Sequence, residues 1–359
     1  MILLLSFDVR RRGGIERLSL QTRTTLERQG QLVRLICPQR WGPGPLGRLC
    51  GRLRFLVQLA WWLPQAQLVL SMHALLLRPV LWLTSLRPQN QRLHCWLHGI
   101  EVWGAALEGV RPALLRCDGL IASSRFSRDQ VLSQPGQWPA TAVVHPMADL
   151  IDGKKQPVPL PASLTLLTVA RMDSGERYKG HRLVLSALAL LRHKGDLPPG
   201  LQWRIVGGGD DQAALEAETE SLDLAPWVRF LGSIEDQQLR QELRHCSLLL
   251  LPSAFSIEPD GRACGEGFGI VYLEAAQAGR ACIACCEGGQ TDLIVDGETG
   301  WLIEPSEHTL AQLLSRLAEQ PKLLASAGHA ARARALSEFD QRCFASALTK
   351  SLNLQMQHL

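Results

Sequence analysis

Short apolar runs alternate with amphipathic stretches from one end of this 359-residue sequence to the other. A short, fully apolar run is typical of a strand that is buried on both faces, as strands are in parallel sheets. The amphipathic stretches between the runs indicate helices that cover those faces. The alternation therefore predicts an α/β protein built on doubly wound parallel sheets.

The alternation occurs in two halves, which residues 149–163 separate. That segment, DLIDGKKQPVPLPAS, is rich in proline, lysine and aspartate, a composition typical of a linker. The first half predicts strands at Ile2–Phe7, Leu32–Ile36, Leu68–Ser71, His94–Leu97, Leu120–Ala122 and Thr141–Val144. The second half predicts strands at Leu164–Val169, Trp203–Val206, Val228–Phe230, Leu248–Leu251, Ala281–Ala284 and Trp301–Ile303. Helices are expected at 14–29, 46–60, 74–84, 104–116 and 124–133, and near the end of the chain at 307–319, 321–336 and 338–356.

From this pattern we predict two Rossmann-like domains that face each other across a cleft, which is the default place for a ligand. The N-terminal domain spans residues 1–150 and the C-terminal domain residues 163–336. Residues 337–359 are expected to form a final helix that packs back on the N-terminal domain.

The net charge of +4 hides an uneven distribution of basic and acidic residues. Residues 1–116 contain 16 arginines, no lysine and 5 acidic residues, an excess of 11 positive charges. The rest of the chain has 22 basic and 29 acidic residues, an excess of 7 negative charges. The basic half indicates an anionic partner or reflects an arginine-rich source genome. We expect no nucleic acid, because arginine without lysine or a recognised binding module is not typical of such proteins.

Two groups of arginines stand out in this half, the second followed by apolar residues. They are Arg10–Arg12, then Arg48, Arg52 and Arg54, which precede Phe55, Leu59 and Trp62. A basic, partly apolar helix of this kind could lie on an anionic membrane. The apolar tract 55–86 is too interrupted to span one. Ten cysteines in 359 residues are too few for a disulfide-stabilised scaffold, and the sequence has no secretory signal pattern. These two features predict a cytoplasmic protein that could be peripheral on the inner face of the membrane.

The densest functional signal is EGFGIVYLE, which runs from Glu266 to Glu274 between a predicted strand and a predicted helix. Its glycines leave the backbone open to a close ligand, and the unpaired amides that begin the helix suit a phosphate. Glu274 could accept hydrogen bonds from a ribose diol, and Glu266 could face the group beyond the phosphates. The alternative is one helix-capping acid and one buried glutamate with internal partners.

A second signal follows the predicted strand Leu164–Val169, where Arg171 leaves the carboxyl end and Lys179 precedes the next helix. A guanidinium and an ammonium at strand exits can clamp a diphosphate, although such a pair can also be surface charge. Glycine-rich turns follow two other strands, at 13–14 and 207–209. Neither turn matches G-x-G-x-x-G with a ribose-binding acid, and no P-loop motif occurs, which weakens nicotinamide and P-loop interpretations.

At these residues the chain resembles the GT-B glycosyltransferases of family 4, the retaining group 1 enzymes with an E-x7-E motif. That motif corresponds here to Glu266 and Glu274. Four further segments are similar to the family: RMDSGERYKGH at 171–181, DLIVDGETGWL at 292–302, GGIERL at 13–18 and HGIE at 98–101. The resemblance is strong over about 164–305 and weaker but continuous over 1–150.

The resemblance implies roles for the two signals in the second half. Arg171 and Lys179 would bind the donor diphosphate and support the leaving group, and Glu274 would hold the ribose. Glu266 would hold the hydroxyls of the donor sugar. The backbone amides beside it complete the implied sugar and phosphate site: Gly267, Phe268 and Gly269, with Ile270 opening the helix.

The resemblance also implies roles elsewhere in the chain. Gly14 would abut the phosphates, and His98 would lie near the sugar on the acceptor side, as a general base or as a structural residue. Residues around Phe230 would border the nucleobase, and Gly207 is a further donor-binding candidate in its glycine-rich turn. The link at 254–265 is longer than is usual in the family, so the resemblance does not carry over a particular sugar.

The implied activity is transfer of a hexose from a nucleoside diphosphate sugar to a glycan, lipid-linked or other hydroxyl acceptor, with retention at the anomeric carbon. We expect no cofactor and no metal, because the sequence has no D-x-D among its acids. Retention could come from same-face attack, which we favour, or from a covalent glycosyl-enzyme. The alternatives are a sugar-nucleotide epimerase, a phosphorylase-like enzyme and a non-catalytic sugar-nucleotide binder on the same fold.

Overall fold

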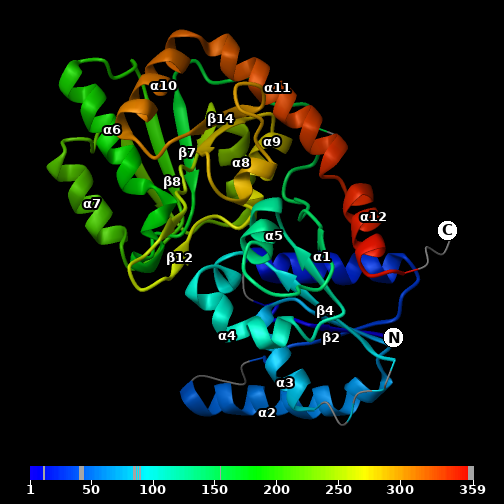
Figure 1. The fold of residues 1–359 in the computed structure, drawn as a ribbon. Coiled ribbons are helices and arrows are strands. Elements are labelled where there is room, and N and C mark those ends of the chain that lie inside the picture. Colours follow the sequence, from blue (N-terminus) through cyan, green and yellow to red (C-terminus); the bar gives the residue numbers. More distant parts are fainter. Residues whose placement is uncertain are drawn as a thin grey trace. The chain divides into compact units, whose positions relative to one another are not determined.

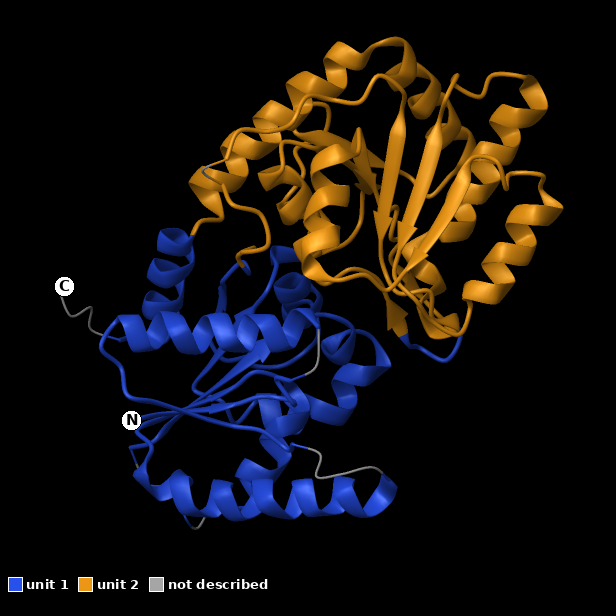
Figure 2. Cartoon of the chain, turned by 180° about the vertical axis from the view of Figure 1, so that it is seen from behind, with its two compact units in different colours: residues 1–146, 259–262, 341–359 blue, residues 147–258, 263–340 orange. Residues whose placement is uncertain are grey.

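The computed structural model describes residues 1–10, 13–39, 44–83, 86, 88, 90–153 and 155–354. The chain divides into two compact units, which Figure 2 colours separately. Unit 1 comprises residues 1–146, 259–262 and 341–359, and unit 2 comprises residues 147–258 and 263–340. Each unit contains one six-stranded sheet. All twelve strands expected from the sequence form, with ends that differ by at most two residues.

The sheet of unit 1 has the strand order β2-β1-β3-β4-β5-β6, and every neighbouring pair is parallel. Its strands are β1 (Ile2–Leu5), β2 (Val33–Ile36), β3 (Leu68–Ser71), β4 (Arg92–Leu97), β5 (Gly119–Ala122) and β6 (Thr141–Val143). The order changes direction at β1, whose neighbours are β2 and β3. In doubly wound sheets such a switch point opens a crevice beyond the carboxyl ends of the strands.

The helices of unit 1 agree with the amphipathic stretches of the sequence. They are α1 (Gly14–Arg28), α2 (Gly44–Trp62), α3 (Leu77–Trp82), α4 (Ala105–Leu114), α5 (Arg125–Leu132) and α12 (Gln341–Ser351). The helix expected at 74–84 is shorter, since a 3-10 turn at Ala74–Leu76 precedes α3. Pro79 has no amide hydrogen for the carbonyl of Leu75, so it fits only in the first turn of a helix. The last helix, α12, contacts α1, where the Thr349 hydroxyl donates to the Gln29 side chain.

The sheet of unit 2 has the order β14-β13-β10-β7-β8-β9, again with every neighbouring pair parallel. Its strands are β7 (Thr165–Val169), β8 (Gln202–Val206), β9 (Val228–Gly232), β10 (Leu248–Leu250), β13 (Ala281–Cys285) and β14 (Gly300–Ile303). Its helices are α6 (His181–Lys194), α7 (Gln212–Ser221), α8 (Asp236–His245), α9 (Ile270–Gln277), α10 (Glu307–Glu319) and α11 (Pro321–Glu338). When the six strands are renumbered from 1 to 6 in chain order, their order in the sheet is 6-5-4-1-2-3. This is the order of a dinucleotide-binding sheet, and its switch point lies between β7 and β10.

Two apolar layers cover the sheet of unit 2, because successive side chains of a strand point to opposite faces. Leu166 and Leu250 lie in one layer with side chains of α6, α7 and α10. Leu167 and Leu249 lie in the other layer with side chains of α8 and α9. Figure 1 labels these helices and the strands β7 and β8 of the sheet. Burial on both faces explains why these strands are apolar at every position.

The unusually long link between β10 and α9 contains a small element that the sequence did not predict. Two short strands, β11 (Ser256–Ile257) and β12 (Ala263–Cys264), pair antiparallel to form a hairpin. The strands have two residues each, too short for an alternation of apolar and polar residues to be recognised.

Candidate functional site

The switch point of unit 2 brings together the loops that follow β7 and β10. These loops carry the two signals identified in the sequence, since Arg171 and Lys179 follow β7 and Glu266 precedes α9. The carboxyl ends of parallel strands lie at one edge of the sheet, so segments far apart in sequence meet there. The meeting point is an ion pair between Lys179 and Glu266, 2.7 Å from Nζ to Oε2.

The Lys179–Glu266 pair is largely shielded from solvent. The two side chains retain 15% and 14% of their accessible surface. Burial alone would lower the pKa of Lys179, but the neighbouring Glu266 carboxylate outweighs burial, and the pKa lies above its ordinary value. Lys179 therefore carries a positive charge at neutral pH in a place that favours an anion. The ring of Tyr178 adds a cation–π contact, with its centroid 5.1 Å from the ammonium nitrogen.

Close backbone packing fixes the position of Lys179. The amide of Ala254 donates to the carbonyl of Tyr178 at 2.9 Å, which ties the loop after β7 to the loop after β10. Gly180 has φ of +82°, and a Cβ there would lie 2.4 Å from the carbonyl oxygen of Pro252. Only glycine allows this approach, so Gly180 brings Lys179 beside the second loop.

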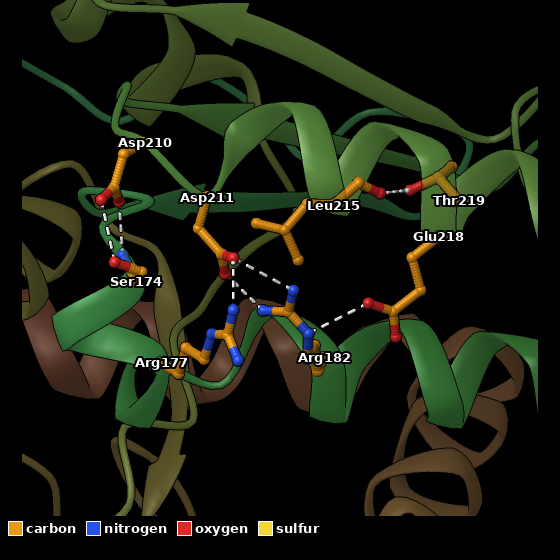
Figure 3. Close-up of polar contacts among 8 residues, drawn as sticks. All are labelled: Ser174, Arg177, Arg182, Asp210, Asp211, Leu215, Glu218 and Thr219. Carbon is orange, nitrogen blue, oxygen red and sulfur yellow. Dashed lines mark hydrogen bonds and ion pairs between the residues drawn. The ribbon is translucent and has the colours of Figure 1, made fainter.

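A network of acidic and basic side chains also holds the segment that precedes α6, as Figure 3 shows. Asp211 retains 5% of its accessible surface and pairs with Arg177 at 2.9 Å and also with Arg182. Asp210 accepts hydrogen bonds from the amide and hydroxyl of Ser174, at 2.6 and 2.8 Å. The two aspartates thus anchor the 3-10 segment Ser174–Lys179 to the start of α7.

Sequence reasoning missed these two aspartates. The signal that could have found them is their place directly after the 207–209 glycines, at the carboxyl end of β8. Parallel strands β7 and β8 are neighbours, so acids that follow β8 lie beside the basic residues that follow β7.

The ionic partners of Arg171 differ from that of Lys179 in this structure. Its guanidinium contacts the carboxylate of Glu176 and lies 3.5 Å from that of Asp173. Its side chain retains 69% of its accessible surface, so it can turn toward an anionic ligand. The diphosphate-clamp prediction for Arg171 and Lys179 stays a prediction.

The start of α9 presents the predicted glycine-rich segment. The loop after β13 packs against it, since the amide of Gly289 donates to the carbonyl of Glu266 at 2.7 Å. Phe268 is buried in the core below, and Ile270 is the first residue of α9, after Gly269. The N-terminal end of α9 therefore lies beside Glu266, at the end of a helix that favours an anion.

Glu274 lies one turn inside α9 and is buried, with 4% of its accessible surface exposed. Both glutamates of the motif thus belong to the β10–α9 region, but Glu274 is the more deeply buried. Its predicted contact with a ribose is not tested by the geometry and stays a prediction.

Two further predicted donor residues have evident structural roles. Gly207 has φ of +138°, and a Cβ there would lie 1.9 Å from the carbonyl oxygen of Ala170, so it allows the loops after β7 and β8 to touch. Phe230, in β9, packs against the apolar layer that includes Trp203. Whether either one also contacts a donor stays untested.

His98 in unit 1 lies in a hydrogen-bonded chain that occupies both ring nitrogens. Nε2 lies 2.6 Å from the carbonyl of Met72, which can only accept, so Nε2 carries the proton. The Ser123 hydroxyl lies 3.3 Å from Nδ1 and accepts from the indole of Trp96 at 2.9 Å. Glu101 accepts from the amides of His98 and Gly99, at 2.6 and 2.9 Å. These contacts favour the structural alternative for His98.

His73 is a candidate that the sequence did not single out. It follows β3 at the switch point of unit 1, and its ring centroid lies 6.2 Å from that of His98 and 4.7 Å from that of Phe7. Burial lowers the pKa of His73 to about 4, so the ring is neutral at pH 7. Its position directly after an apolar strand was the available signal.

The other unit 1 predictions have mixed outcomes. Gly14 begins α1, and the carboxylate of Glu16 lies over the preceding Gly13 at the same helix end. Phe55 and Leu59 are buried in unit 1. The prediction that these two side chains meet a membrane is therefore wrong. Trp62 stacks with Arg34, whose guanidinium lies 4.6 Å from the ring centroid.

Some predictions concern residues or groups outside these clusters. Arg11 and Arg12 lie outside the described residues, and Arg10 pairs with Asp8 at 2.7 Å. The ten cysteines are free thiols. Across the described part of the chain, no group of three His, Cys, Asp or Glu side chains is placed to hold a metal ion. No helix among the described residues is long and apolar enough to cross a membrane.

Comparison with known proteins gives the family. The sequence model of the glycosyl transferases group 1 matches residues 155–334, half of the chain. A glycogen synthase of Mycobacterium tuberculosis is 27% identical over 256 residues, 70% of this chain and 55% of that protein. A GDP-mannose-dependent alpha-(1-6)-phosphatidylinositol monomannoside mannosyltransferase of Mycolicibacterium smegmatis is 26% identical over 292 residues, 74% of this chain and 71% of that protein. The chain thus spans about half the length of the first of these relatives.

Solved structures show the fold. HepE of Anabaena, crystallised with UDP and glucose, superposes with a TM-score of 0.74 at 21% identity, covering 98% of this chain and 99% of that one. The fold is GT-B, with two Rossmann-like domains, as the sequence predicts.

Proposed function

The chain is a member of the glycosyl transferases group 1 family, and from this membership we propose that it transfers a hexose from a nucleoside diphosphate sugar to a hydroxyl acceptor. The observation that carries the proposal is the shielded Lys179–Glu266 pair beside the start of α9. It places a fixed cation, a carboxylate and the N-terminal end of a helix at the switch point of a dinucleotide-type sheet.

A nucleoside diphosphate sugar matches this set of groups. The ammonium of Lys179 and the N-terminal end of α9 suit the diphosphate, and the Glu266 carboxylate can accept hydrogen bonds from sugar hydroxyls. The solved relative HepE, which binds UDP-glucose in one crystal structure, supports a nucleotide sugar as donor. The mannosyltransferase relative is named for GDP-mannose, so the proposal does not specify the nucleobase of the donor.

We propose that transfer retains the anomeric configuration and needs no metal. The bond between the anomeric carbon and the phosphate oxygen breaks, and the acceptor oxygen bonds to the same face of that carbon. The acceptor proton passes to the departing phosphate oxygen, and a nucleoside diphosphate leaves. Arg171 and Lys179 stabilise the negative charge that develops on the diphosphate, which is electrostatic catalysis by preplaced groups. Arg171 would first exchange Glu176 for phosphate.

We assign the acceptor to unit 1 and the donor to unit 2. The excess of positive charge in residues 1–116 suits an anionic or lipid-linked acceptor, as in the synthesis of cell-surface polysaccharide or glycolipid. The ten free thiols support a reducing compartment, so we place the reaction in the cytoplasm, on the inner face of the membrane.

The test is nucleotide release by the purified full chain. Thermal shift with UDP-, GDP- and ADP-sugars first identifies the donor. Release is then measured with and without acceptor extracts. We expect Glu266→Gln and Arg171→Ala each to lower the rate by about 10²–10³, the usual loss when one preplaced charge-stabilising group is removed.

Asp223→Asn is the matched control in unit 2. Asp223 pairs with Arg192 at 3.0 Å on the surface, so the variant changes a carboxylate without touching the site. Wild-type rates in both site variants would refute the site. Complete nucleotide release without an acceptor would favour a hydrolytic activity instead, and conversion of the donor sugar without net nucleotide release would favour an epimerase.

A further inference from the structure

The helix α2 of unit 1 has a second apolar face, opposite the one that packs on the domain. The packed face consists of Gly47, Gly51, Phe55 and Leu59, one residue in every four. The exposed face, which we call the α2 stripe, consists of Leu46, Leu49, Leu53, Val57 and Trp61. Leu46, Val57 and Trp61 retain 75%, 69% and 68% of their accessible surface.

Helical geometry shows that these residues form one continuous strip. At about 100° per residue, the five side chains lie within a sector of about 120°. The strip follows the helix for about four turns, roughly 23 Å. Single exposed apolar residues are ordinary, but a contiguous strip of five large ones on a soluble domain marks an interaction surface.

The charged residues of α2 are all arginines. The helix contains no acidic residue, and Arg52 and Arg54 project on opposite sides of the strip. Arg48 is exposed nearer the start of the helix. Long basic side chains that flank an apolar strip can place their stems along acyl chains and their charges among phosphates.

An exposed tryptophan supports the same occupant. Trp61 ends the strip and retains 68% of its accessible surface. Tryptophan is enriched where headgroups meet acyl chains, because its ring is apolar and its N–H needs a polar partner. An aromatic residue at the edge of an apolar strip is therefore what an interfacial helix requires.

We propose that the α2 stripe inserts into the surface of a bilayer that contains anionic lipids, with α2 lying in the plane of the membrane. The inference deepens the proposed function, since it makes a lipid-linked acceptor accessible to unit 1. The membrane contact is thus assigned to the exposed face of α2, opposite the Phe55 and Leu59 face that the sequence had suggested.

The test is co-sedimentation of the purified full chain with vesicles of phosphatidylcholine alone or with about 30% phosphatidylglycerol. We expect binding to the anionic vesicles. The double variant Leu53→Ser with Val57→Ser should weaken it about tenfold or more, because two apolar groups no longer enter the membrane. Both positions are exposed, so the fold should tolerate the change.

Leu32→Ser is the matched control, since Leu32 is 72% exposed in unit 1 but lies outside α2. It should bind like wild type. A second measurement uses the native Cys50, which is exposed within the same sector of α2, after Cys343→Ser removes the other exposed thiol. An environment-sensitive dye on Cys50 should shift to the blue when anionic vesicles are added.

Several outcomes would overturn the inference. Equal binding of the double variant and wild type would show a purely electrostatic contact. A dimer in analytical ultracentrifugation that the double variant abolishes, without vesicle binding, would assign the stripe to a second copy of the chain. Failure is distinguishable from failure of the proposed function, because donor turnover with a soluble acceptor does not require vesicles.

Discussion

The two units carry their candidate residues in turns at the carboxyl ends of parallel strands, but the turns are stabilised by different forces. In unit 2, opposite charges hold the loops, through Lys179 with Glu266 and Asp211 with its two arginines. In unit 1, His98 is held by uncharged hydrogen-bonding groups, and only Glu101 adds a charge, toward backbone amides. The difference teaches that ion pairs fix the turn of unit 2, whereas the ring of His98 in unit 1 is fixed by neutral hydrogen-bonding partners.

The largest predicted effect concerns backbone contact between the loops of unit 2. Gly207→Ala should lower the free energy of unfolding by about 3–5 kcal/mol, because its Cβ would overlap a carbonyl that cannot move independently of β7. Chemical denaturation measures this loss. The control is Gly195→Ala, where φ is also positive (+73°) but no atom lies near the added Cβ. That variant should lose about 1 kcal/mol.

The same substitution in unit 1 sharpens the comparison. At Gly119, an added Cβ would meet the ring of His94 at 2.7 Å, and a ring can rotate where a backbone cannot. Gly119→Ala should therefore cost less than Gly207→Ala. An equal cost would show that the start of β5 in unit 1 is as tightly constrained as the loops of unit 2.

The next effect is a response to acid that should be greater in unit 1. Burial lowers the pKa of His73 and of His94 to about 4, from an ordinary value of 6.5. In unit 2, burial lowers the pKa of His181 to about 4 in the same way. Between pH 6.5 and about pH 4, each of these histidines binds a proton in the unfolded chain but not in the folded chain. The stability of the fold therefore falls as the pH falls. From pH 7 to about pH 5, each histidine should cost about 2 kcal/mol.

Hydrogen exchange resolved by segment checks this response. With two such histidines against one, the strands of unit 1 should lose protection before those of unit 2 as the pH is lowered. His94→Gln should reduce the loss in unit 1, and His193→Gln, at an exposed position, should not. Earlier opening of unit 2 would contradict the comparison.

The sequence predicted the sheets better than the sites, for a physical reason. Burial on both faces makes every residue of a strand such as Leu248–Leu250 apolar, and that signal is local. The Lys179–Glu266 contact depends on strand order, which no local pattern encodes. The two faces of α2 were confused because both are apolar, and only packing shows that Phe55 is inside and Val57 outside. Asp211 was missed because its partners, Arg177 and Arg182, precede it by about 30 residues.

The smallest predicted effect compares the carboxylates that hold the two turns. Asp211 binds two guanidinium groups, and Glu101 binds two backbone amides. Asp211→Asn removes a charge from charge-assisted hydrogen bonds and should cost about 1.5 kcal/mol. Glu101→Gln replaces one acceptor oxygen with an NH₂ group, loses one amide hydrogen bond, and should cost about 1 kcal/mol.

Salt separates the two cases. At about 1 M salt, the loss for Asp211→Asn should shrink, because Arg177 and Arg182 are partly exposed and their attraction to the carboxylate is screened. The loss for Glu101→Gln should change little, since its partners carry no net charge. Asp211→Asn should also raise the KM for the donor, because the segment that carries Lys179 is then less firmly anchored to α7. If both variants respond to salt alike, the turns of the two units are stabilised by the same forces and the distinction between them does not hold.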